Sequence, residues 1–230
     1  MAQTTAVITT VMNTAASKNT KALLAFIALG LLFLAALQIV IVSASLHFSS
    51  LKQPSIEQPD NAWLDLAEVL SIANPDVFSA RASFLRQKAT LLEFKLQQDD
   101  FLKEALENLA RAAEIRPLWP YYSLAELNIL VLQDAAAERV QEKVAHIIKL
   151  APNERGLDKH LLELAFHSWD KLSSEQQQWM LTRLAIVPGG TLKYVYSVAK
   201  SLNHKTVICT NLPYRKIKNI TLSNFRIYLA

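Results

Sequence analysis

Glycine and cysteine are scarce in this chain, which has four glycines and one cysteine among 230 residues. So few glycines argue against an all-β fold, because such folds need many tight turns. The single cysteine, Cys209, excludes an internal disulfide, a cysteine-based zinc cluster and a CxxC redox motif. A glycine-rich phosphate loop is also missing from the sequence. We therefore expect no cofactor and no metal, and the many helix-forming residues of the middle of the chain favour an all-α fold.

Acidic residues are missing from both ends of the chain. Residues 1–46 contain Lys18 and Lys21 and no acid. All 20 acidic side chains lie within residues 47–204. Residues 205–230 form a basic tail without an acid, and its basic residues are Lys205, Arg215, Lys216, Lys218 and Arg226. The formal net charge of +4 is too small to indicate a nucleic-acid partner.

Residues 22–46 form an apolar run of 25 residues without a charged side chain. Roughly 20 apolar residues suffice for an α-helix to cross the hydrocarbon core of a bilayer. Lys18 and Lys21 precede the run, and the next charge is Lys52. Because positive charge beside a span favours the cytoplasmic side, we expect residues 1–21 to be a cytoplasmic tail. The prediction is a single-pass anchor in membrane lipid with the body outside the cytoplasm, which is the periplasm if the membrane is a bacterial inner membrane.

A cleaved signal peptide is the alternative to this anchor, because Ser43, Ala44 and Ser45 resemble a small-residue cleavage site. The apolar part of a signal peptide usually spans about 7–15 residues, fewer than this run. The absence of a cysteine near residue 45 excludes a lipoprotein. We therefore expect an uncleaved anchor followed by a polar linker over residues 47–59.

Apolar residues recur at helical spacing through residues 60–204. The first helix is expected to be capped by Asp60 and to bury Trp63, Leu66, Ala67, Leu70 and Ala73. The second is predicted to end near Gln98, with a stripe formed by Ala82, Leu85, Ala89, Leu92 and Leu96. The third is expected to begin at Asp99 or Asp100, with a stripe formed by Phe101, Ala105, Leu109 and Ala112.

Later helices show start signals in the sequence. We expect Asp134 to open a helix that carries Val140, Val144, Ile147 and Ile148. Ser173 or Ser174 stands three residues before Gln176 or Gln177, which is the spacing of a capping box, in which each side chain bonds the other residue's backbone amide. A break at Pro188 precedes the last predicted helix, whose stripe is Leu192, Val195, Ala199 and Leu202.

Prolines follow apolar helical segments at nearly regular intervals, at positions 75, 117, 152 and 188. Each interval has room for two helices and two turns, and proline-closed helix pairs of about 34 residues are typical of tetratricopeptide repeats. The best match to such a repeat is Ala105, Leu109, Ala112 and Pro117, and Pro120 then opens the next helix, where no hydrogen bond is lost. We predict a tetratricopeptide-like stack of antiparallel helix pairs over residues 60–204.

The segment AEIRPLWPY, together with an N-terminal span and a body of helix pairs, resembles the VpsP-type polysaccharide biosynthesis proteins. The resemblance covers mainly residues 105–128. It implies a non-catalytic scaffold in exopolysaccharide biosynthesis or export, with other inner-membrane or periplasmic polysaccharide-assembly proteins as partners. A scaffold for a respiratory or secretory complex is one alternative, and a polysaccharide-modifying enzyme is the other.

Trp119, Tyr121 and Tyr122 are the candidate partner-binding residues. Packing in the core and in the turn is the simplest role for them. The functional alternative is that one or two line the concave groove with which helical solenoids bind partners, because aromatic anchors supply much of the binding energy in protein interfaces. A glycan contact through an aromatic face is a further alternative.

Catalytic candidates are few. His160 and His167 would need to converge with Asp158 or Glu163 to hold a metal ion, and His146 belongs to an earlier helix. Cys209 is flanked by apolar residues and is expected to be a buried thiol. Residues 211–229 of the basic tail are expected to be a frayed end, a short strand or clamp that packs back on the body, or a contact with anionic lipid or polymer. We expect no enzyme.

Overall fold

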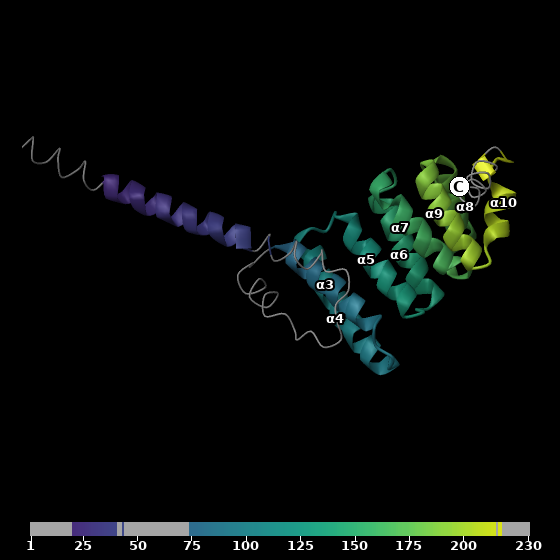
Figure 1. The fold of residues 1–230 in the computed structure, drawn as a ribbon, viewed down its shortest axis with the longest axis horizontal. Coiled ribbons are helices and arrows are strands. Elements are labelled where there is room, and N and C mark those ends of the chain that lie inside the picture. The colour runs from purple at the N-terminus through teal and green to yellow at the C-terminus, as the bar shows by residue number, and fades with distance from the viewer. Residues whose placement is uncertain (1–19, 41–42, 44–73, 215, 218–230) are drawn as a thin grey trace, which may run out of the picture. The chain divides into compact units, whose positions relative to one another are not determined.

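The computed structural model describes residues 20–40, 43, 74–214 and 216–217 of the chain. These residues belong to two compact units. The first unit holds an N-terminal helix and the second holds the helices from α3 onward (Figure 1). The predicted helix over residues 60–73 lies outside the described residues, as do the whole linker over residues 47–59 and the end of the basic tail.

The N-terminal helix runs over Thr20–Val40 and has a mean hydropathy of 2.7. At about 1.5 Å per residue, its 21 residues span roughly the 30 Å of a bilayer core. None of its most apolar stretch is buried against protein. The helix begins two residues before the predicted start at Ala22, and most of the predicted end lies outside the described residues. The chain thus has one described helix that is long and apolar enough to cross a membrane.

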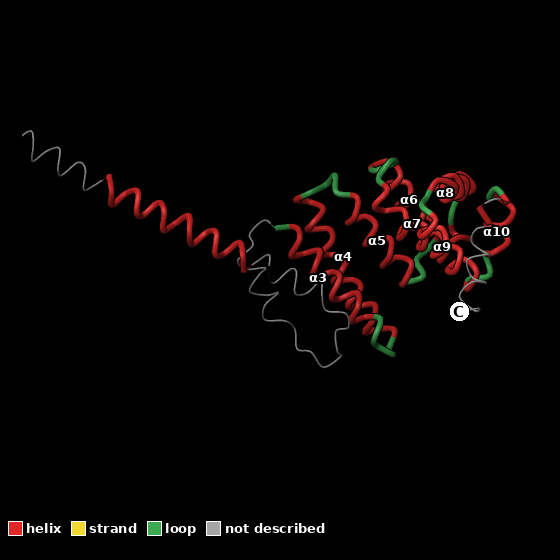
Figure 2. The backbone as a smooth tube through the Cα atoms, turned by 45° about the horizontal axis from the view of Figure 1, so that its top comes forward, coloured by secondary structure: helices red, strands yellow, loops and turns green. Residues whose placement is uncertain are grey.

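The second unit is all-α in its described part, as predicted, and contains no strand there (Figure 2). Two short 3₁₀ turns, η1 (Arg155–Leu157) and η2 (Trp169–Lys171), flank one of its helices. Its α-helices are α3 (Pro75–Ala89), α4 (Lys95–Ile115), α5 (Pro120–Leu132), α6 (Ala137–Leu150), α7 (Asp158–His167), α8 (Ser174–Ile186), α9 (Gly189–Ser201) and α10 (Lys205–Asn211).

Helix boundaries follow local chemistry at several predicted positions. Pro117 lies in the turn after α4, and Pro120 is the first residue of α5, where the missing amide proton costs no hydrogen bond. The Ser173 hydroxyl accepts from the Gln176 amide, and the Gln176 side chain accepts from the Ser173 amide. The proline break between α4 and α5 and the capping box of α8 are therefore confirmed.

Asp134 does not open a helix, so that prediction is wrong. It has a φ of 54° and follows the last residues of α5. The Ala135 amide donates to the Leu130 carbonyl and the Asp134 amide to the Val131 carbonyl, which is the hydrogen-bond pattern of a Schellman cap. Aspartate tolerates the left-handed conformation better than most residues, so Asp134 ends α5, and α6 begins at Ala137 without a side-chain cap.

The second predicted helix boundary is also wrong, because α3 ends at Ala89 instead of near Gln98. The chain reverses over residues 90–94, and α4 begins at Lys95, so Asp99 lies inside the first turns of α4 and pairs with Lys95 at 3.3 Å. The apolar spacing continues through the turn, but Leu96 is exposed. The reversal is required because α4 must fold back to bury its own stripe against α3.

The basic tail begins inside the folded body instead of after it. Residues Lys205–Asn211 form α10, which packs on α9. Ile208 is fully buried and Leu212 is buried beside it, and both join the larger core. Cys209 is only partly buried, where a buried thiol was expected. The first residues of the basic tail thus pack on the body as a helix, whereas most of residues 211–229, for which the three roles are predicted, lie outside the described residues.

Successive helix pairs stack through equivalent helices. Helices α3 and α4 pack as one pair and α5 and α6 as the next, and the pairs follow one another in chain order to α10 (Figure 1). Helix α3 contacts α5, α5 contacts α7, and α7 contacts α9, while α6 contacts α8. The odd-numbered helices therefore form one layer of the stack, as in tetratricopeptide-like solenoids.

The core consists of two clusters of buried side chains. The larger one extends from α5 to α10 and includes the stacked rings of Phe166 and Trp169, whose centroids are 4.9 Å apart. The smaller one joins α3, α4 and α5. It contains the predicted repeat residues Ala105, Leu109 and Ala112, and both alanines are completely buried. Small residues at these positions let α3 and α4 approach closely.

Ala105→Trp should lower the stability of the body by about 1–3 kcal/mol, because an indole cannot enter a fully packed site without displacing its neighbours. Thermal denaturation followed by circular dichroism measures the effect. Ala110 is an exposed alanine of the same helix, so Ala110→Trp is the matched control and should leave the midpoint nearly unchanged. Equal midpoints for the two variants would contradict the close packing of α3 and α4.

Candidate binding groove

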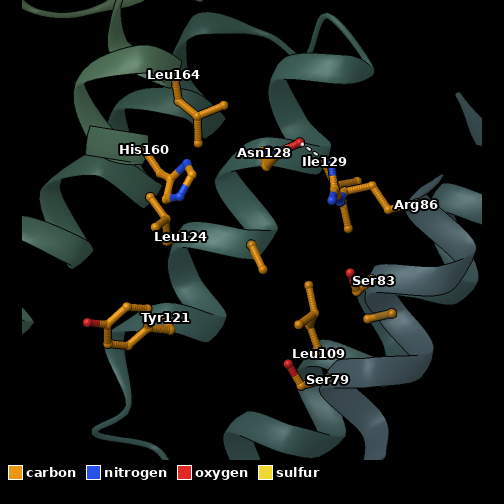
Figure 3. A pocket seen from close by; sticks show the side chains of 12 residues that line it. Ser79, Ser83, Arg86, Leu109, Tyr121, Leu124, Asn128, Ile129, His160 and Leu164 are labelled. Atoms are coloured by element: carbon orange, nitrogen blue, oxygen red, sulfur yellow. Dashed lines mark hydrogen bonds between the residues drawn. The ribbon is translucent and has the colours of Figure 1, made fainter. Parts of the chain in front are cut away.

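A groove of about 270 Å³ lies between the odd-numbered helices α3, α5 and α7 (Figure 3). Leu109 of α4 also reaches it. The polar or partly polar side chains of its lining come from all three odd-numbered helices and are Ser79, Ser83, Arg86, Tyr121, Asn128 and His160. The groove therefore lies on the layer that the odd-numbered helices form.

Helical periodicity explains why these side chains meet. Ser79, Ser83 and Arg86 are spaced i, i+4 and i+7 on α3, so they share one face of that helix. Tyr121 and Asn128 have the same i, i+7 spacing on α5. Because α3 and α5 contact each other, the two polar faces border the same space. Figure 3 shows Arg86 extending from α3 toward Asn128 on α5.

Arg86 is the charged residue of α3 that enters the groove. Its guanidinium Nη1 donates to Asn128 Oδ1 at 3.4 Å, which is a long hydrogen bond. Burial lowers the pKa of Arg86 below its usual value, because desolvation disfavours the charged form. None of the ion pairs between described residues involves Arg86. The groove thus holds a half-buried positive charge with little compensation.

The three predicted partner-binding aromatics are placed differently. Tyr122 is 3% exposed and belongs to the smaller core, so it packs inside the body. Trp119 and Tyr121 are 46% and 36% exposed, and their ring centroids are 5.1 Å apart. Only Tyr121 lines the groove. The sequence prediction therefore treated one buried and two exposed aromatic residues alike. All three lie at the start of α5, and their exposure depends on the direction in which each side chain points.

The phenol of Tyr121 is held at one end of the groove. Desolvation, together with the negative charge of the nearby Glu154 carboxylate, raises the pKa of Tyr121. A Cβ added at Gly156 would lie 2.3 Å from the Tyr121 hydroxyl and 2.9 Å from Glu154 Oε1. Glycine at position 156 therefore leaves the space that the Tyr121 hydroxyl occupies, and this explains why the η1 turn has no side chain there.

The catalytic candidates of the sequence do not converge. His146, His160 and His167 are all exposed, and within the described ranges no group of three or more His, Cys, Asp or Glu side chains could hold a metal ion. The Glu163 carboxylate accepts a hydrogen bond from the Tyr194 hydroxyl at 2.6 Å, and this bond raises the pKa of Tyr194 to about 12. The other oxygen of the same carboxylate lies 3.5 Å from His160 Nδ1.

Asp158 has a structural partner instead of a catalytic one. Its carboxylate accepts from Arg183 Nε, and both side chains are buried. The same guanidinium donates through Nη1 to the Pro152 carbonyl at 2.9 Å. Arg183 therefore ties α8 to the start of α7 and to the turn after α6.

Sequence reasoning missed Arg86 and Asn128. The available signal was the polar stripe of α3, where Ser79, Ser83 and Arg86 recur at helical spacing beside the apolar stripe of Ala82 and Leu85. Such a stripe normally faces solvent. The stripe borders a groove only because α5 packs beside α3.

The fold is a stack of helix pairs, and polar and aliphatic side chains line the groove between its odd-numbered helices. No family model matches the chain, and neither a curated protein nor a solved structure matches it.

Proposed function

We propose that the protein is a non-catalytic, membrane-anchored scaffold that binds a partner protein in the groove between α3, α5 and α7. The observation that carries this proposal is the groove itself, which is formed by equivalent helices of successive pairs. Stacked helical repeats use such extended surfaces to bind partners. The apolar N-terminal helix would hold the body at a membrane and so raise its local concentration near membrane partners.

The pathway proposed for this scaffold is exopolysaccharide biosynthesis or export. Its support is the resemblance of the segment AEIRPLWPY and of the overall layout to the VpsP-type proteins. The partners would then be other inner-membrane or periplasmic polysaccharide-assembly proteins, and the body would lie in the periplasm. A scaffold for a respiratory or secretory complex would use the same groove and anchor with a different partner.

An enzyme that modifies polysaccharide is the alternative from another class. Glycoside hydrolases need two carboxylates facing the scissile bond about 5–10 Å apart. The described lining of the groove contains no carboxylate, and the buried carboxylate of Asp158 is engaged with Arg183. These placements favour binding over hydrolysis.

The proposed function is tested by polymer yield in a deletion strain complemented with variants at equal protein levels. Tyr121→Ala should reduce the yield without unfolding the body, because it removes an exposed aromatic contact of the groove. Tyr214 is 77% exposed and does not line the groove, so Tyr214→Ala is the matched control. His167→Ala and Cys209→Ser should also leave the yield unchanged.

Two outcomes would contradict this function. If a single substitution of a carboxylate, or of a histidine outside the groove such as His167, abolished the polymer from a folded protein, the scaffold would be refuted in favour of an enzyme. If deletion of the gene left the polymer unchanged, the protein would serve another envelope complex.

A further inference from the structure

We infer that the groove binds a carboxylate carried by an extended, partly apolar segment of the partner protein, and that Arg86 is the residue that receives it. The inference rests on the proposed function in so far as the groove is the partner's site. It adds the chemistry of the segment that binds there. Its support is the placement of Arg86, the lining around it and the charge of the groove.

The guanidinium of Arg86 has unused capacity for hydrogen bonds. A guanidinium carries five N–H donors in a planar fork that matches a carboxylate. Among the described residues, Asn128 is the hydrogen-bond partner of Arg86, and the contact is long at 3.4 Å. An anion in the groove would give this half-buried charge the partner that it lacks.

Neighbouring side chains favour an anion at the same place. The hydroxyls of Ser79 and Ser83 lie on the face of α3 that carries Arg86, and His160 lines the opposite side on α7 (Figure 3). Hydroxyls and an imidazole N–H can donate to carboxylate oxygens. The described lining itself contains no carboxylate, and Glu154 beside Tyr121 and Glu163, 3.5 Å from His160 Nδ1, lie outside that lining.

The rest of the lining favours a peptide over a glycan. Six of the residues around the groove are aliphatic: Ala82, Leu109, Leu124, Ala125, Ile129 and Leu164. Aliphatic walls suit the side chains that flank an acidic residue in a peptide. A sugar ring is instead recognised by flat aromatic faces, and in the described lining Tyr121 is the one aromatic residue. The carboxylate is therefore expected to belong to an aspartate, a glutamate or a chain terminus beside apolar residues.

The experiment is a selection of random peptides with free carboxyl termini on the full-length protein in detergent micelles. Enriched peptides should contain a carboxylate next to apolar residues. Their affinity for the wild-type protein, for Arg86→Gln and for Arg139→Gln is then measured by fluorescence anisotropy. Arg139 is an exposed arginine of α6 outside the groove, so its variant loses the same charge elsewhere.

Arg86→Gln should weaken binding by about 10- to 100-fold, the usual loss for a charge-assisted hydrogen bond to a carboxylate. Arg139→Gln should have almost no effect, and Arg86→Lys should retain part of the affinity. Amide versions of the peptides, with asparagine or glutamine at the acidic position, should bind the wild type as weakly as the acidic peptides bind Arg86→Gln.

Three results would overturn the inference. They are a selection that enriches no acidic peptide, an equal loss of affinity for the two arginine variants, and Arg86-dependent binding of uronate oligosaccharides in the absence of peptide binding. The last result would assign the groove to an anionic polymer.

Failure of the proposed function has a different signature. In that case the polymer yield would not change in the groove variants, while binding of the acidic peptides would still depend on Arg86. Conversely, the polymer yield could depend on Tyr121 while acidic peptides fail to bind. The scaffold function would then stand, and the inference that the groove binds a carboxylate would be refuted.

Discussion

Arg183→Met is expected to lower the stability of the body by about 3–5 kcal/mol, because it leaves the carboxylate of Asp158 buried without its positive partner. The guanidinium also donates to the Pro152 carbonyl at 2.9 Å, and this bond is lost as well. Methionine approximates the volume of the side chain, so most of the effect comes from the uncompensated charge. Chemical denaturation at neutral pH measures the loss.

The double variant Asp158→Leu with Arg183→Met should recover much of the lost stability, because no unpaired charge remains in the core. The matched control is the exposed ion pair in which Arg116 Nη1 lies 3.2 Å from Asp76 Oδ1. Arg116→Met should cost at most about 1 kcal/mol, since solvent screens exposed pairs. A double variant as unstable as Arg183→Met alone would show that packing and not charge decides the effect.

Removal of residues 1–46 from an otherwise exported protein should move it completely from the membrane fraction to the soluble fraction. The apolar helix Thr20–Val40 is the described segment that is long and apolar enough to cross a membrane. Full-length protein should stay in the pellet after alkaline washing, which removes peripheral proteins. We also expect a reporter fused after residue 60 to be active only outside the cytoplasm, because Lys18 and Lys21 precede the helix.

Substitutions within the helix test whether it inserts into the membrane, and the N-terminus of the mature product separates an anchor from a signal peptide. Leu29→Arg places a charge near the centre of the span, where it costs about 2.5–3.5 kcal/mol, and should weaken insertion, whereas Leu29→Ile should behave as the wild type. Recovery of a soluble product that begins near Leu46 would show cleavage and would replace the anchor by a signal peptide.

Helix starts could be predicted from the sequence where the residue type allows only one position in a helix. Pro120 is tolerated in a helix only in its first turn. The spacing of Ser173 or Ser174 from Gln176 or Gln177 predicts a cap at this place, and the structure forms it with Ser173 and Gln176. Asp134 was harder to predict, because aspartate suits both a helix start and a left-handed helix end. Its role follows from the reversal of the chain between α5 and α6, which is a property of the packed pair.

The sequence by itself determined the helical class, the apolar N-terminal run and the proline-punctuated repeat, since composition and periodicity of about 3.6 residues act within single segments. It could not separate Tyr122 in the core from Tyr121 at the groove, because adjacent residues differ only in the direction they face. It also gave no sign that the polar stripe of Arg86 borders a groove or that Asp158 meets Arg183. Those pairs are 42 residues apart for Arg86 and Asn128 and 25 apart for Asp158 and Arg183. Only the stacking of one helix pair on the next brings such distant residues together, so the tertiary structure decided the site.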